Sequence, residues 1–335
     1  MSSSTFLTGS TRSWQPPKTA DTTTASYWLN WRVLLCSIWI LMSMVFASIL
    51  ISKYENCRNS KESTENQEED NAGVLYEDEV WMPCLKNIHP GWLLVFRVFA
   101  FCVLLLMLIV NVIVDGGSIF YFYTQWTFTL VTIYFALGSL LSMHGCYRYI
   151  NDSGSNKHLD TEGGFYVLNA TKGKNLNQEN PVRQIAGFWG YVFQVIFQMN
   201  AGAVVLTDIV FWFIIVPFLA IKDYNLNLLI ITMHSINAVF LLGDTALNCL
   251  RFPWFRIGYF FLWTAVYVVF QWLVHACVSL WWPYPFLDLS SSFAPLGYST
   301  VALMHIPCYG VFVLIMKAKH SLLSKWFPQT YRCAQ

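Results

Sequence analysis

Charged residues are scarce in this chain of 335 residues: lysine, arginine, aspartate and glutamate together make up 12% of it. Soluble globular proteins carry about 25% charged residues, so the composition excludes an ordinary soluble enzyme. A basic excess is absent as well, because the formal net charge is only +1. That balance excludes the electrostatic footprint of a nucleic-acid-binding protein, and we expect no nucleic-acid partner.

Three other common signals are missing. The nine cysteines include no Cys-x-x-Cys pair, so we predict no structural metal site and no cofactor. Residues 1–30 are polar and rich in serine and threonine, without the short apolar segment of a cleaved leader. No cysteine falls in a predicted lumenal loop, and we therefore expect no disulfide framework.

Long apolar runs make up most of the remaining sequence. A helix that crosses the hydrocarbon core of a bilayer, roughly 30 Å thick, needs about 20 mostly apolar residues. We predict an all-α fold, a polytopic membrane helix bundle with seven transmembrane helices. Residues 185–221 form either one tilted helix or an interfacial helix followed by a span. The predicted spans lie within residues 33–51, 92–114, 119–142, 185–221, 226–243, 257–281 and 298–316.

Loop charge predicts the orientation, because lysine and arginine accumulate on the cytosolic side of membrane proteins. With seven spans, one side holds 15 basic residues and the other holds 4; dividing 185–221 into two spans changes this to 9 against 10. We therefore predict an outside or lumenal N-terminus and a cytosolic C-terminus, in the plasma membrane or the endoplasmic reticulum.

The acidic stretch at 55–79 is expected to be disordered. The predicted units are a polar tail (1–30), a first transmembrane helix (31–51), an acidic cytosolic loop (52–91), a six-helix core (92–316) with a cytosolic loop at 143–184, and a cytosolic tail (317–335).

Polar side chains inside the spans follow helical spacing. Placing such a group at the membrane centre costs about 2.5–3.5 kcal/mol of free energy, and the group therefore usually faces the bundle interior. His234, Asn237 and Asp244 share one face of the fifth span, and Gln271 and His275 share one face of the sixth. Arg97 and Asp244, at the cytosolic ends, are predicted to form a structural ion pair. The rise per residue of an α-helix gives the depth of each polar side chain below the lumenal end of its span. By this measure five side chains lie at a similar depth, in one layer near the lumenal headgroups: Thr127, Asp208, His234, His275 and His305.

Several short segments in this part of the chain resemble a known membrane family. They are QWTFTLV at 125–131, DIVFWF at 208–213, MHS at 233–235, QWLVH at 271–275 and WWPYPFLD at 281–288. Their order and spacing are similar to those of the androgen-induced gene family, over roughly the last six spans. Over the whole chain the sequence resembles plant multi-pass proteins akin to the fly rolling stone protein.

The first resemblance implies an activity. Members of the androgen-induced family are intramembrane hydrolases of fatty acid esters of hydroxy fatty acids, with a threonine nucleophile and a histidine. The resemblance implies that Thr127 is the threonine nucleophile and that His234 is the histidine of this pair. Supporting roles would fall to His275, Asp208, Gln271 and Asn237. The chain departs from the family at Ile231, where a second histidine is common, and in its additional N-terminal span.

Other functions remain open at this point. Rolling stone is linked to myoblast fusion, which favours a non-catalytic protein in adhesion, fusion or scaffolding. A lone threonine in a membrane helix usually bonds a carbonyl one turn back, here that of Tyr123. A metal-dependent lipid hydrolase would use His234, His275, His305 and Asp208 as ligands, and a receptor would fit seven spans. The predicted partners are membrane lipids and, for the hydrolase, a lipid ester substrate.

Overall fold

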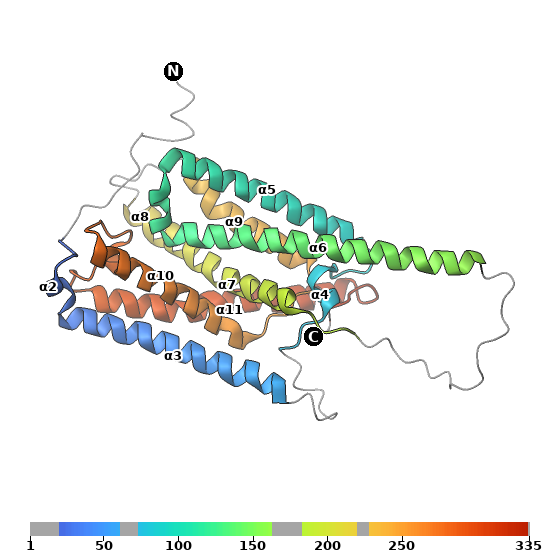
Figure 1. Ribbon diagram of the computed structural model, residues 1–335, viewed down its shortest axis with the longest axis horizontal. Helices are drawn as coiled ribbons and strands as arrows, with labels where there is room; N and C mark the ends of the chain where they lie inside the picture. The colour runs from blue at the N-terminus through green and yellow to red at the C-terminus, as the bar shows by residue number, and fades with distance from the viewer. Residues whose placement is uncertain (1–19, 61–72, 163–182, 220–227, 334–335) are drawn as a thin grey trace, which may run out of the picture.

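A computed structural model describes residues 20–60, 73–162, 183–219 and 228–333, and seven helices in these ranges are long and apolar enough to cross a membrane. The chain is therefore a multi-pass integral membrane protein with an all-α fold, as predicted. The long helices run side by side along the long axis of the molecule (Figure 1). They are α3 (Trp31–Ser60), α5 (Pro90–Asp115), α6 (Tyr123–Glu162), α7 (Phe188–Ile209), α9 (Leu228–Leu247), α10 (Ile257–Cys277) and α11 (Ala294–Trp326).

Helix α7 occupies the middle of the bundle. It contacts α6 and α9 on one side and α10 and α11 on the other, and α3 packs on α10 and α11 at the edge (Figure 1). After Ile209 the helix continues through a π-helical segment, η2 (Val210–Ile215), and one turn, α8 (Val216–Leu219). The fourth predicted span is thus one continuous helix between residues 188 and 219.

Two predicted cytosolic loops contain more structure than expected. Helix α6 continues to Glu162, into the predicted loop at 143–184. In the acidic stretch at 55–79, predicted to be disordered, residues 55–60 extend α3 and residues 77–79 begin α4 (Glu77–Trp81), whose Glu79 and Trp81 are buried. Residues 61–72 of that stretch lie outside the described ranges. Helix α4 forms because Glu79 is held by tertiary partners, namely Arg183 and Arg251, that local composition does not reveal.

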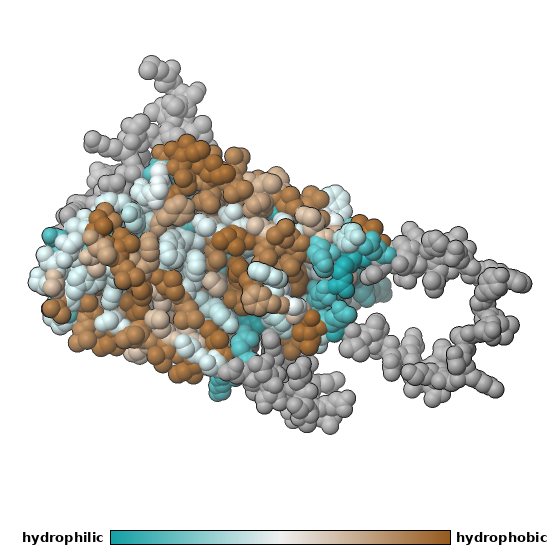
Figure 2. Space-filling model, viewed as in Figure 1, coloured by the Kyte–Doolittle hydropathy of each residue, from teal (hydrophilic) through white to brown (hydrophobic). Residues whose placement is uncertain are grey.

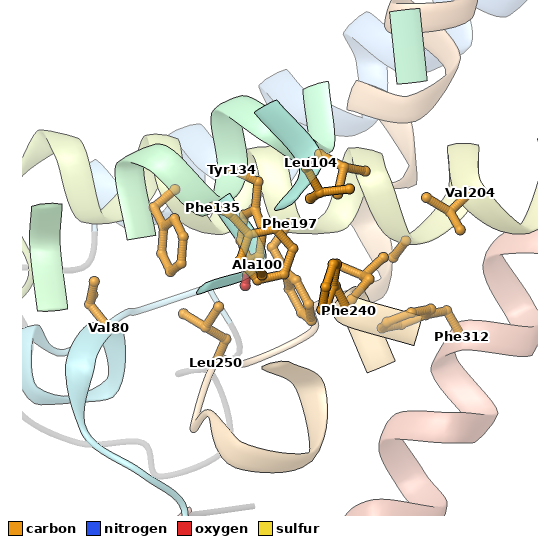
Figure 3. Close-up of a cluster of buried hydrophobic side chains, with 14 of the residues drawn as sticks. Val80, Ala100, Leu104, Tyr134, Phe135, Phe197, Val204, Phe240, Leu250 and Phe312 are labelled. Atoms are coloured by element: carbon orange, nitrogen blue, oxygen red, sulfur yellow. The ribbon is translucent and has the colours of Figure 1, made fainter. Parts of the chain in front are cut away.

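Aromatic side chains fill the core between α5, α6, α7, α9 and α11. Tyr134 stacks on Phe193 with ring centres 4.6 Å apart, and Phe197 lies against both Tyr134 and Phe312 (Figure 3). The outside of the bundle is also apolar, and in Figure 2 hydrophobic side chains cover its flanks. This exposed surface is the part that a bilayer would cover, since lipid rather than water would contact it.

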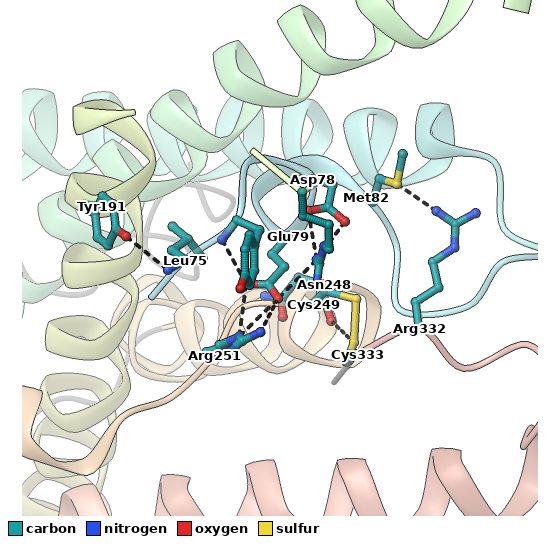
Figure 4. A network of polar contacts seen from close by, with 12 residues as sticks. Leu75, Asp78, Glu79, Met82, Tyr191, Asn248, Cys249, Arg251, Arg332 and Cys333 are labelled. Carbon is teal, nitrogen blue, oxygen red and sulfur yellow. Dashed lines mark hydrogen bonds and ion pairs between the residues drawn. A yellow bond between two sulfur atoms is a disulfide. The ribbon is translucent and has the colours of Figure 1, made fainter. Parts of the chain in front are cut away.

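Polar side chains gather at the two ends. At the predicted cytosolic end, where hydrophilic side chains cluster in Figure 2, Arg183 binds Asp78. Arg251 binds Glu79 at the same end (Figure 4). At the opposite end, the described segment around Thr22 lies against the end of α10, where Thr22 Oγ1 donates to the carbonyl oxygen of His275 at 2.7 Å. Loops predicted to share a side of the membrane therefore meet at one end of the bundle.

The expectation of no disulfide is wrong for one pair. Cys249, just after α9, is joined to Cys333 in the C-terminal tail, with the Cα atoms 5.3 Å apart (Figure 4). The pair is 84 residues apart, so only the folding of the tail against the end of α9 reveals it. The backbone N–H of Arg332 donates to the Cys84 carbonyl and holds this tail in place.

Burial raises the pKa of the neighbouring Cys84 thiol, which keeps it protonated and unreactive.

Loss of this disulfide is expected to destabilise the protein. Cys333→Ser opens a loop of 84 residues, and cross-links of such length typically contribute about 2–4 kcal/mol by restricting the unfolded chain. We expect the lower value, about 2 kcal/mol, because the spans stay helical when unfolded in a membrane. Thermal unfolding in detergent without reductant measures it. Cys102→Ser, at an exposed free cysteine, is the matched control and should leave the midpoint unchanged; equal midpoints for both variants would contradict the prediction.

Helices α7 and α10 approach closely at Gly202. A Cβ atom added there would lie 2.3 Å from the ring of Phe260, which is fully buried. Gly202→Ala is therefore expected to lower the free energy of unfolding by about 1–3 kcal/mol through overpacking. Gly310→Ala in α11, where a Cβ atom meets nothing within 4 Å, is the control and should be neutral or stabilising by up to about 1 kcal/mol. Chemical unfolding of both variants in the same micelles compares them directly, and equal stability would show that Phe260 moves aside freely.

Candidate functional site

Arg97 and Asp244, the predicted ion pair, are in direct contact and fully buried. Arg97 Nε donates to Asp244 Oδ1 at 2.7 Å. Asp244 Oδ2 accepts from the Tyr134 hydroxyl and, at 2.8 Å, from Asn248 Nδ2. Lys319 Nζ in turn donates to the carbonyl oxygen of Asn248. This cluster fastens α5, α6, α9 and α11 together, and its saturated hydrogen bonding indicates a structural role.

Thr127, the predicted nucleophile, is fully buried on α6. Its hydroxyl has no hydrogen-bond partner among the described residues, so it does not bond the carbonyl oxygen of Tyr123 one turn back. The Tyr123 hydroxyl lies beside it without a hydrogen bond of normal geometry. Thr127 is thus an unbonded hydroxyl that faces protein and not lipid.

His234, the predicted base, lies on α9 with its ring stacked on Phe211, the ring centres 3.6 Å apart. Its Nδ1 atom has no partner in the described part of the chain. The hydroxyl of Thr127 is likewise unbonded, so no hydrogen bond links the two residues. The catalytic roles of Thr127 and His234 therefore stay a prediction from the resemblance.

The four predicted supporting residues contact neither Thr127 nor His234 through the hydrogen bonds found within the described ranges. Gln271 Nε2 donates to the Tyr121 carbonyl oxygen at 2.8 Å. The His275 ring stacks on a tryptophan and its nitrogens face two carbonyl oxygens. Asn237 Oδ1 accepts from the next backbone N–H, and Asp208 Oδ1 is unbonded.

The structure instead pairs a different threonine with a different histidine. His305 Nε2 on α11 lies 2.8 Å from Thr264 Oγ1 on α10, and Thr264 Oγ1 lies 2.8 Å from the Tyr123 hydroxyl on α6. The rings of Phe260 and Phe261 pack against His305, with centres 4.2 and 4.6 Å away. Three helices thus contribute to one continuous chain of polar atoms that leads from His305 to the side of Thr127.

Hydrogen-bond partners determine the direction of this chain. His305 Nδ1 lies 2.8 Å from the Val301 carbonyl oxygen, which can only accept, so Nδ1 carries the hydrogen. In a neutral imidazole Nε2 is then an acceptor. The single proton of Thr264 Oγ1 has two acceptors, His305 Nε2 at 2.8 Å and the Phe260 carbonyl oxygen one turn back at 3.3 Å, and we assign it to the shorter contact. The Tyr123 hydroxyl consequently donates to Thr264 Oγ1. A threonine hydroxyl aimed at the lone pair of a histidine is the ground-state arrangement of a nucleophile with its base.

This pair opens onto a small apolar pocket, with a cavity volume of about 50 Å³, between α3, α10, α11 and η4 (Pro285–Leu287). Small-ligand sites are typically lined by apolar side chains with a few placed polar groups, and the lining of this pocket has that composition. The outer wall is supplied by α3 at the edge of the bundle, through Trp39, Ile40 and Ser43. The remaining lining residues are Phe261, Thr264, Ala265, Val268, Phe286, Leu287, Tyr298, Val301, Ala302 and His305.

Thr264 lies one to two helical turns deeper in the bundle than the predicted lumenal turn between α5 and α6. The carbonyl oxygen of Tyr121 in that turn accepts from Tyr267 and Gln271 of α10, one and two turns beyond Thr264.

The metal-site alternative lacks a matching cluster. His234, His275 and His305 each stack on a different aromatic side chain. The described ranges hold no group of three histidine, cysteine or carboxylate side chains placed to bind one ion.

Sequence reasoning missed Thr264 and Tyr123, and it assigned His305 only to the layer and to a metal site. One signal was available, since Thr264 precedes Gln271 and His275 by seven and eleven residues, which puts all three on one helix face. Comparison with known proteins adds no relative: no protein-family model matches the chain, and no curated protein or solved structure does so.

Proposed function

We propose that this membrane protein hydrolyses lipid esters, with Thr264 as the nucleophile and His305 as the general base. The observation that carries the proposal is the 2.8 Å contact between Thr264 Oγ1 and His305 Nε2 at the wall of an apolar pocket. A threonine hydroxyl is a weak nucleophile until an adjacent base takes its proton, and neutral imidazole is the usual base. The resemblance to the androgen-induced hydrolases supports the same class of reaction.

In the proposed reaction, Thr264 Oγ1 attacks the carbonyl carbon of the ester while its proton passes to His305 Nε2. The bond from that carbon to the leaving oxygen then breaks, and His305 returns the proton to the departing alcohol. Water repeats both steps on the acyl-threonine and releases the fatty acid. The Val301 carbonyl oxygen holds the imidazole in the required tautomer, which is the part that an orienting carboxylate has in a catalytic triad.

Tyr123 is the proposed oxyanion donor. In the resting site its hydroxyl donates to Thr264 Oγ1, and it also lies beside Thr127. Once Thr264 Oγ1 is bonded to the acyl carbon, the tyrosine proton is free to approach the negative oxygen of the intermediate. Donors placed before the reaction in a dry site stabilise such an oxygen strongly.

Covalent labelling tests the proposal. The purified full-length protein is treated with an alkyl fluorophosphonate, and the modified peptide is located by mass spectrometry. We expect the phosphonyl group on Thr264 and its loss in His305→Gln. Labelling of Thr127 that is lost in His234→Gln would move the reaction to the pair predicted from the resemblance. Absence of labelling, together with no hydrolysis of lipid esters, would end the hydrolase proposal.

A further inference from the structure

Asp208 is an ionisable side chain in the membrane-spanning part of α7 that the proposed hydrolysis does not use. Its Oδ1 atom is buried, and neither a hydrogen bond nor an ion pair engages the residue within the described ranges. It lies seven residues before the end of its span at Ile215, or about 10 Å from the predicted lumenal surface. Ionisable residues in spans are costly and usually mark a functional site.

Asp208 lines a second pocket, with a cavity volume of about 190 Å³, between α7, α9 and α11. Every other side chain in its wall is aliphatic or aromatic, including Val204, Leu242 and Phe312. None of these residues lines the pocket of Thr264 and His305. One acidic group in an otherwise apolar cavity is the complement of a ligand with one polar group and a hydrocarbon chain.

The backbone next to Asp208 supports a binding role. The helix changes to π-helical hydrogen bonding at Val210–Ile215, two residues after Asp208, and Trp212 and Phe213 of this segment line the same pocket. Single π-helical turns inside α-helices occur mostly at functional sites, because the extra residue redirects side chains at a cost in regular hydrogen bonding.

We propose that this pocket binds a long-chain primary amine, a lipid of the sphingoid-base type, with its ammonium group on Asp208. An ammonium supplies both the missing opposite charge and the missing hydrogen-bond donors, whereas a fatty acid would place a second carboxylate beside the first.

Photolabelling with a bifunctional sphingosine, which carries a diazirine and an alkyne, tests this proposal. The full-length protein in nanodiscs is labelled in parallel with a fatty alcohol and a fatty acid of equal chain length and the same two groups. We expect the amine to label peptides of α7, α9 or α11 at least ten-fold more strongly than the alcohol or the acid. Asp208→Asn is expected to reduce amine labelling about ten-fold, because the amide keeps the size of the side chain and removes its charge.

Two further variants make the outcome decisive. Asp115→Asn removes another acidic group at the lumenal end of a span, outside this pocket, and should leave labelling unchanged. Leu242→Trp fills the pocket while keeping the carboxylate, and should also abolish labelling, which decides the matter if Asp208→Asn does not fold. Equal labelling by amine and alcohol, or full labelling in a folded Asp208→Asn or Leu242→Trp protein, would overturn the proposal.

Discussion

Asp244→Asn is expected to lower the free energy of unfolding by about 3–5 kcal/mol, which is the range for breaking a buried ion pair from one side. The amide keeps the shape of the side chain but leaves the Arg97 guanidinium, fully buried, without an opposite charge. Tyr134 and Asn248 also lose the carboxylate oxygen that accepts their hydrogen bonds. Denaturation in detergent, followed by tryptophan fluorescence, measures the change.

Two comparisons isolate the cause. The double variant Arg97→Met with Asp244→Leu removes both charges, and apolar replacements of buried pairs are often close to neutral, so it should be more stable than Asp244→Asn alone. Arg148→Gln breaks the pair with Glu77, whose side chains are 44% and 33% exposed, and should change stability by less than about 1 kcal/mol. Similar losses from Asp244→Asn and Arg148→Gln would refute the structural role of the buried cluster.

Thr264→Val is expected to abolish ester hydrolysis, with kcat reduced by at least about 10³-fold. Valine matches the shape of threonine and removes the attacking oxygen, while His305→Gln removes the base, whose contribution is typically about 10²–10⁴-fold. Because nucleophile and base act as one unit, the double variant should be no slower than the worse single variant. Thr264→Ser keeps a hydroxyl and should retain part of the activity. Initial rates with a lipid ester in mixed micelles measure all four.

Thr245→Val is the matched control for this series. Thr245 is a buried threonine of α9 whose hydroxyl bonds the carbonyl oxygen of Leu241 one turn back, so its loss should leave kcat unchanged. Thr127→Val separates the two candidate nucleophiles: a modest effect fits a neighbour of Tyr123, and complete loss with an active Thr264→Val would restore the assignment made from the resemblance. Full activity in both Thr264→Val and His305→Gln would refute the proposed site.

The ion pair and the hydroxyl pair differ in how visible they are in the sequence. Arg97 and Asp244 could be paired from the sequence because a charged side chain inside a span needs a partner of opposite charge, and the spans contain few charged residues. Thr264 needs no partner on another helix, since a threonine hydroxyl can always bond a carbonyl of its own helix. Its partner therefore depends on how α10 and α11 are rotated about their axes, which the sequence pattern does not specify.

The same contrast applies to the fold. Apolar length and loop charge determined seven membrane helices and the grouping of their loops, because the bilayer imposes a fixed span length and an asymmetric cost on basic residues. The order of α4 and the Cys249–Cys333 bond depended on tertiary contacts, as did the pairing of Thr264 with His305. Each joins residues that are far apart along the chain and whose local sequence is compatible with several partners, so only the packing of the helices selects among them.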